Sequence, residues 1–211
     1  AFDADNETIS TALHALTTLD EDSNITVAGG PAATTDITVE FRGALGSQSV
    51  VKLVAETDAS DPLVGVDEKQ RITITGTPTG GDFTLSFTSG ATTQTTGAIA
   101  FDAAHGAVQT ALQALGLIDG VTTSGGAFPG AYVDVEFTGS GVDETDQTLM
   151  TVTSSLTGGT TPAIAITTVT AGYAPTVTVT RSIFGWKFAN EIQQVTVRAS
   201  GGKFKLADRK S

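Results

Sequence analysis

The two histidines are the first residues to consider for catalysis or metal binding, because imidazole is a common general base and metal ligand. His14 and His105 each fall within a predicted helix. Neither helix carries a second ligand one turn away, as the His-Glu-x-x-His pattern of zinc enzymes does. We therefore predict that both histidines are exposed helical side chains that bind no metal.

Oxygen-bearing side chains that could hold calcium occur at residues 20–24, which read Asp-Glu-Asp-Ser-Asn. This spacing matches the start of an EF-hand loop, in which alternate oxygens converge on one cation. Ile25 stands where such a loop needs glycine, and Pro31 stands where it needs a bidentate glutamate. We expect no metal and no cofactor, with structural calcium in the acidic loops as the alternative.

Sequence patterns of nucleophilic or phosphate-binding sites are incomplete in this chain. Residues 139–141 lack the Gly-x-Ser-x-Gly frame of a nucleophile elbow. Residues 201–203 lack the preceding glycine and the following Ser or Thr of a P-loop. The chain has no cysteine, which excludes a thiolate nucleophile or a thiolate-bound metal. We expect the protein not to be an enzyme.

The charge of the chain disfavours nucleic acid as a partner. Its 23 acidic and 11 basic residues give a net charge of −12, which repels phosphate backbones. Its apolar stretches are far shorter than the roughly 20 residues that cross a bilayer, so we expect no membrane partner. Residues 181–211 differ, because they hold seven basic residues and two acids. We expect this basic segment to dock on an acidic surface, of another protein or of the same chain.

The elements that would position any site come from an internal repeat. Phe2-Asp3-Ala4 recurs 99 residues later as Phe101-Asp102-Ala103, and a helical pattern follows each copy. Residues 68–74 match 191–197, and residues 80–85 match 201–206. The matches divide the chain into a repeat unit that lacks its opening hairpin (1–67), a complete unit (68–172), and a non-repeat segment followed by the opening hairpin of a third unit (173–211).

The complete unit is predicted to be α+β and rich in strands. Residues 70–75 and 83–87 alternate apolar and polar side chains around a glycine-rich turn, which predicts a β-hairpin. A strand at 95–100 precedes an amphipathic helix with Asp102 as its N-cap. The remaining strands are expected at 131–137, 148–153 and 163–169. The order predicts tandem modules, each a mostly antiparallel sheet or sandwich with one amphipathic helix on one face.

The first unit lacks opening strands, which would leave a sheet edge and part of its helix uncovered. The hairpin at residues 190–206 has the matching pattern. It could complete the first unit, within the chain or from a neighbouring copy by strand addition. The alternative is that the sequence is a stretch of a longer protein that is cut within a domain at both ends.

Aromatic and basic residues gather in the non-repeating residues 181–188. They include the only Trp and two of the ten Phe, and such residues anchor protein interfaces. The alternative is that this segment covers the core of the second unit. The candidate partner-interface residues, with two lysines of the hairpin, are Arg181, Phe184, Trp186, Lys187, Phe188, Lys203 and Lys205.

Residues 67–85, Asp-Glu-Lys-Gln-Arg-Ile-Thr-Ile-Thr-Gly-Thr-Pro-Thr-Gly-Gly-Asp-Phe-Thr-Leu, resemble a repeat of structural proteins of tailed bacteriophages, particularly those of actinobacterial hosts. The resemblance covers 68–172 well, 1–66 and 190–206 in part, and 173–189 not at all. Residues 60–63 replace the Leu-Thr-Gly-Gly turn that the second unit has at 156–159. Similar repeats occur in large bacterial surface proteins, so the resemblance identifies a module rather than a location.

The resemblance implies a non-enzymatic protein on the surface of a virion. Its expected role is a capsid decoration or cement protein that docks on other virion subunits, as a homo-oligomer or in many copies on a symmetric lattice. A minor tail protein is one alternative. A bacterial cell-surface adhesin or carbohydrate-binding module is another, although two Tyr and one Trp are few for a sugar-binding face.

Overall fold

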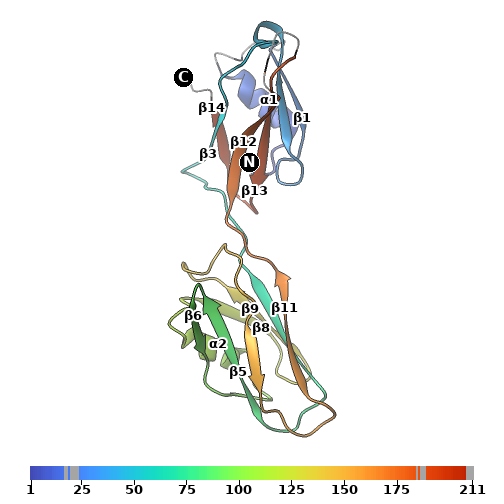
Figure 1. Cartoon of the computed structure of the whole chain (residues 1–211), viewed down its shortest axis with the longest axis vertical. Helices are drawn as coiled ribbons and strands as arrows, with labels where there is room; N and C mark the ends of the chain where they lie inside the picture. The colour runs from blue at the N-terminus through green and yellow to red at the C-terminus, as the bar shows by residue number, and fades with distance from the viewer. Residues whose placement is uncertain (17–18, 20–23, 184, 186–188, 208–211) are drawn as a thin grey trace. The chain divides into compact units, whose positions relative to one another are not determined.

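The computed structural model describes residues 1–16, 19, 24–183, 185 and 189–207, which form fourteen β strands and two α helices (Figure 1). All the strand pairs are antiparallel. The prediction of a strand-rich fold with antiparallel sheets and few helices is therefore confirmed. Within the described residues, no helix has both the length and the apolar character that crossing a bilayer requires.

The chain divides into two compact units. Unit 1 combines residues 1–65 with 174–211, and unit 2 is residues 66–173. The predicted boundaries were 67/68 and 172/173. The first and last residues of unit 2, Val66 and Tyr173, are paired. Their backbones exchange two hydrogen bonds of 3.0 and 2.9 Å.

Unit 2 contains two antiparallel sheets with a shared core. The larger sheet has the order β11 (Ala163–Thr170), β4 (Lys69–Thr75), β9 (Tyr132–Phe137), β8 (Val121–Gly125). In the smaller sheet β5 (Asp82–Ser89) lies between β10 (Thr151–Ser154) and β6 (Thr92–Thr95), and it also pairs with β7 (Ile99–Ala100). The alternation of β4 buries one face, with Gln70, Ile72 and Ile74 pointing into the core.

Helix α2 (His105–Gln113) packs against β8 of this core. It buries Val108 and Leu112, which lie four residues apart and therefore on one helical face. The N-cap is Ala104, which makes no side-chain cap bond, so the prediction of Asp102 as N-cap is wrong. In unit 1, Asp5 caps α1 (Asn6–His14) by accepting a 2.8 Å hydrogen bond from the Thr8 amide.

Unit 1 has a larger sheet with the order β12 (Thr176–Ile183), β13 (Ile192–Arg198), β2 (Ile37–Phe41), β1 (Ile25–Gly29). Its smaller sheet pairs β14 (Phe204–Ala207) with β3 (Val54–Thr57), and a short 3₁₀ helix lies at Gly43–Leu45. Strand β13 pairs with β2 of the same chain, so the hairpin of residues 190–206 lies in unit 1 without help from a neighbouring copy. Strand β12, which holds Arg181, also belongs to unit 1.

Candidate interaction surface

A buried Glu and a buried Gln hold one edge of unit 1 together. Both Glu191 and Gln193 are fully buried, and the Gln193 amide donates a 2.6 Å hydrogen bond to the Glu191 carboxylate. Gln193 Oε1 accepts a 2.8 Å bond from the Leu53 amide, and Glu191 Oε2 accepts a 3.1 Å bond from the Val50 amide. This Glu-x-Gln clamp therefore fixes the segment that leads into β3 against the start of β13.

Unit 2 has the same clamp, formed by Glu68 and Gln70. Gln70 Nε2 donates to Glu68 Oε1 at 3.0 Å, and Gln70 Oε1 accepts from the Met150 amide at 2.9 Å. Glu68 Oε2 accepts from the Gln147 amide at 3.1 Å. Gln147 and Met150 lie 97 residues after their unit 1 counterparts. The sequence match of 68–74 with 191–197 located these residues, but their structural role was missed.

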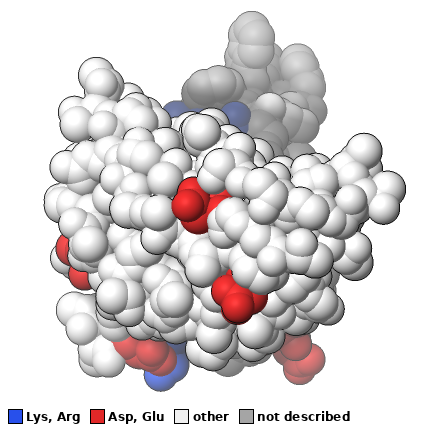
Figure 2. Space-filling model, turned by 90° about the horizontal axis from the view of Figure 1, so that it is seen from below, with Lys and Arg blue, Asp and Glu red and all other residues white. Residues whose placement is uncertain are grey.

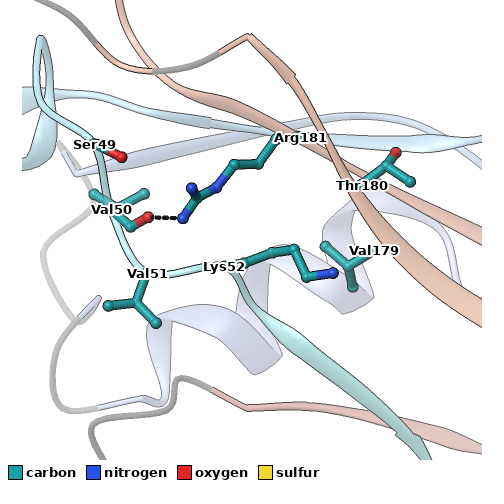
Figure 3. Close-up of a pocket in the computed structure, with 7 residues that line it drawn as sticks. All are labelled: Ser49, Val50, Val51, Lys52, Val179, Thr180 and Arg181. Carbon is teal, nitrogen blue, oxygen red and sulfur yellow. Dashed lines mark hydrogen bonds between the residues drawn. The ribbon is translucent and has the colours of Figure 1, made fainter.

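A groove of about 870 Å³ lies beside the unit 1 clamp, between the segment before β3 and the edge strand β12 (Figure 3). We call it the edge groove. Its walls combine valine side chains with two cations. The lining residues are Ser49, Val50, Val51, Lys52, Val179, Thr180 and Arg181.

Arg181 is held within unit 1 as a wall of the edge groove. Its Nε lies 3.0 Å from Glu191 Oε1, and its guanidinium also donates to the Val50 carbonyl (Figure 3). The side chain is 24% exposed. In unit 2, Thr168 occupies the matched register position opposite the clamp glutamine. The arginine is therefore a feature of unit 1 alone, and its first role is to neutralise a buried carboxylate.

Lys52 gives the edge groove a cation that solvent reaches. Its side chain is exposed and extends from the segment before β3 toward Val179 (Figure 3). Val51 beside it is 42% exposed. Exposed apolar side chains beside a cation suit an extended partner segment that carries both apolar and carboxylate side chains.

The other predicted interface residues have different surroundings. Lys203 and Lys205 have exposed side chains that form ion pairs with Asp61 and Asp58, at 3.1 and 3.2 Å, and neither lysine lines the edge groove. The basic hairpin thus pairs with acids of its own unit. The remaining predicted interface residues, which lie outside the described residues, are Phe184, Trp186, Lys187 and Phe188.

Asp58 makes the stability of unit 1 depend on pH. Hydrogen bonds from the backbone and side chain of Ser60, with a smaller effect of Lys205, lower the pKa of Asp58 from 3.8 to about 2. A lowered pKa in the folded state stabilises the protein above pH ~3.8, and this contribution is lost as the pH falls toward ~2. We expect Asp58→Asn to lower the melting temperature at pH 5 and to match the wild type near pH 2. A difference that stays constant over this range would contradict the assignment.

A cluster of three polar side chains, Arg71, Asp134 and Tyr132, lies on the larger sheet of unit 2. Arg71 forms two hydrogen bonds of 2.7 and 2.9 Å with the two carboxylate oxygens of Asp134, on the neighbouring strand. These bonds raise the pKa of Arg71, and its guanidinium lies 3.7 Å from the ring centre of Tyr132. Tyr132 is 44% exposed. One face of its ring is therefore covered, which leaves less of it for a sugar to stack on.

The histidines and carboxylates show no metal-binding arrangement in the described part of the chain. No three His, Cys, Asp or Glu side chains gather there. His14 and His105 are half-buried rather than exposed as predicted. Their rings lie within hydrogen-bond distance of Ser10 and Thr123. Residues 20–23 of the candidate calcium loop lie outside the described residues.

Figure 2 shows a face of mainly uncharged side chains with separate acidic groups.

The comparisons with known proteins do not assign the chain. No protein-family model matches it, and the search of curated proteins found no match.

Proposed function

We propose that the chain is a non-enzymatic structural protein of a tailed-bacteriophage virion, which docks on other virion subunits as a capsid decoration protein. The resemblance of residues 68–172 to a repeat of such proteins is the starting point. The geometry of the two units adds support, because both look like copies of one rigid module.

The two units correspond in the strand order of their larger sheets as well as in sequence. The larger sheets have corresponding orders, β12-β13-β2-β1 and β11-β4-β9-β8. The helices α1 and α2 begin 99 residues apart. The backbone of the clamp glutamate also accepts a matched bond, from Phe41 at 2.9 Å in unit 1 and from Phe137 at 3.0 Å in unit 2. Duplication of one module accounts for these correspondences.

The use of the buried carboxylates is the observation that carries the proposal. Glu68 and Glu191 are fully buried, and each binds backbone amides of its own unit. A catalytic carboxylate needs access to a substrate, whereas these two close an edge of the fold. The two buried carboxylates therefore stabilise the fold, as expected of a scaffold protein.

The edge groove is the surface that we propose for docking. It is open and combines three valines with the cations Lys52 and Arg181, in a chain with a net charge of −12. An acidic segment of another virion subunit fits this combination better than a basic one does.

The proposal is tested by separate incubation of the purified chain with capsids and with tails of phages from actinobacterial hosts, followed by cosedimentation. A glycan array is run in parallel. We expect saturable binding to capsids. Binding to tails alone would replace the decoration role by that of a minor tail protein. Binding to glycans alone would contradict the virion assignment and favour an adhesin.

Reversing the accessible charge of the edge groove should weaken docking. We expect Lys52→Glu to reduce the affinity for the particles by about tenfold, because it places a carboxylate against an acidic partner. Arg198→Glu is the matched control, because Arg198 is an exposed cation of the same unit that does not line the edge groove, and it should leave the affinity within about twofold. Arg181 is unsuitable for this test, because its loss would also disturb Glu191. Equal affinities of the two variants would remove the edge groove from the interface.

A further inference from the structure

The larger sheet of unit 2 ends in a long strand with one unpaired side. Strand β11 pairs with β4, and no strand pairs with its other side in the described part of the chain, which includes all of residues 66–173 (Figure 1). The backbone N–H and C=O groups of such an edge are a template for a further strand. This side of β11 is therefore a candidate binding site.

Strand β11 lacks most of the features that protect an edge strand from pairing. Short length, charged side chains and proline are common protective features. β11 has eight residues, and none of them is charged or a proline. The strands at the other ends of the two sheets are shorter, with five residues in β8 and four each in β6 and β10. The one irregularity of β11 is a shift of register between Thr168 and Thr170, which leaves residues 163–168 in regular pairing with β4.

Strand β12 has the matched place at the edge of the larger sheet of unit 1. It carries Arg181, whose side chain is partly exposed beside the edge groove. A charge on an edge strand opposes pairing with a second copy of the same strand, because the pairing brings like charges together. The long uncharged edge is therefore particular to unit 2.

The side chains of β11 alternate between a partly buried apolar row and an exposed row of small residues. Ile164 and Ile166 pack against the core of unit 2 but are only half-buried. Ala163, Ala165 and Thr167 point to the other face of the sheet and are exposed. An added strand continues this sheet best if it places apolar side chains opposite the two isoleucines and small side chains on the other face.

A second copy of β11 has this pattern. In an antiparallel pair with a two-fold axis at Ala165, Ile164 of each copy lies opposite Ile166 of the other. Ala165 then lies opposite its own copy, and Ala163 lies opposite Thr167. The contact brings no charged side chains of β11 together, so two chains with a net charge of −12 avoid direct repulsion along this strand. This self-complementarity favours a second copy as the occupant.

We propose that two copies of the chain associate through residues 163–167 of β11 by antiparallel strand addition, with the two-fold axis at Ala165. The backbone hydrogen bonds join the two larger sheets of unit 2 into one continuous sheet. So short a contact buries less area than the roughly 1,200 Å² of a stable interface, and we expect a dissociation constant of about 100 μM. The association is independent of the virion assignment and of the edge groove.

Sedimentation equilibrium of the full chain between about 10 μM and 1 mM tests the association. We expect a reversible monomer–dimer equilibrium that added salt strengthens, because screening weakens the repulsion between two acidic chains. A chain that remains monomeric at about 1 mM in high salt would overturn the proposal.

A lysine on the edge of β11 provides a variant with a matched control. Ala165→Lys should weaken the dimer at least tenfold, because it places two ammonium groups opposite each other at the two-fold axis. Ala91→Lys makes the same change of charge at an exposed alanine outside β11 and should leave the dimer within about twofold. Equal dimerisation of both variants would overturn a site on this edge.

Single cysteines test the position of the two-fold axis in a chain that has no cysteine of its own. Ala165→Cys should form a disulfide-linked dimer on mild oxidation, because each Cα atom lies about 5 Å from its copy. Ala163→Cys is the control on the same face, and its copy lies about 14 Å away. Crosslinking of Ala163→Cys, or none of Ala165→Cys, would overturn the proposed pairing.

Discussion

Replacing Glu191 by alanine is expected to lower the free energy of unfolding of unit 1 by about 3 kcal/mol or more. The substitution removes the partner of Arg181 and leaves the Val50 amide and the Gln193 side chain without their shared acceptor. Buried donors that lose their acceptor are costly because water cannot replace it. Guanidinium unfolding measures the loss, and hydrogen exchange identifies the unit that is destabilised.

Glu56→Ala is the matched control, because Glu56 is an exposed glutamate on β3 of the same unit. Its effect should stay within about 0.5 kcal/mol. Hydrogen exchange should become faster in unit 1 for Glu191→Ala, with the amides of Val50 and Leu53 among the most affected. A loss of less than about 1 kcal/mol would contradict a structural role for the clamp.

Phe137→Ala should destabilise unit 2 by about 3–5 kcal/mol. Phe137 is fully buried, and its ring stacks on Phe87 with 5.4 Å between the ring centres. Truncation removes apolar contacts from both sheets of the unit and leaves a cavity that a rigid core fills only in part. Denaturant unfolding measures the change.

Phe137→Leu is the control that tests whether the loss of apolar volume causes the destabilisation. It keeps much of the apolar volume and should cost less than about 1.5 kcal/mol. Similar losses for the two variants would mean that the site tolerates a cavity, which would contradict a tightly packed core shared by the two sheets.

The local patterns of the sequence predicted much of the fold. Alternation located β4 and the first part of β5, and the repeated Phe-Asp-Ala motif located both helices. The N-cap of α2 was wrong, because Asp102 lies two residues before the observed cap at Ala104. The backbone geometry determines which residue is the N-cap, and the presence of a suitable side chain such as aspartate does not determine it alone.

Strand β12 has a clear strand pattern of its own, outside the internal repeat. Residues 176–180 read Thr-Val-Thr-Val-Thr, a period-two pattern typical of a strand. The segment has no counterpart in the repeat, so the neighbouring aromatic residues dominated its interpretation. The prediction of Arg181 as an interface residue did not include its contacts within unit 1, where its guanidinium binds Glu191 and the Val50 carbonyl.

The partners of the clamp residues could not be predicted from the sequence alone. Gln70 interrupts an otherwise apolar face of β4, which could have marked it as a buried polar residue. Its partners Thr148 and Met150 lie 78 and 80 residues away. Only the packing of the two sheets brings these residues together, and no local pattern encodes that distance.

The most direct test asks whether β13 pairs with β2 of the same chain. Gln194 and Thr38 are partners in register, so their Cα atoms should lie about 5 Å apart, within disulfide range. The chain has no cysteine of its own, and Thr26 with Gln194 is the control pair, because β2 separates these residues. After oxidation of the Thr38→Cys, Gln194→Cys variant, we predict a monomer with an internal disulfide and no disulfide in the control. Disulfide-linked dimers, or thiols that stay free, would contradict the closure of unit 1 by the two ends of one chain.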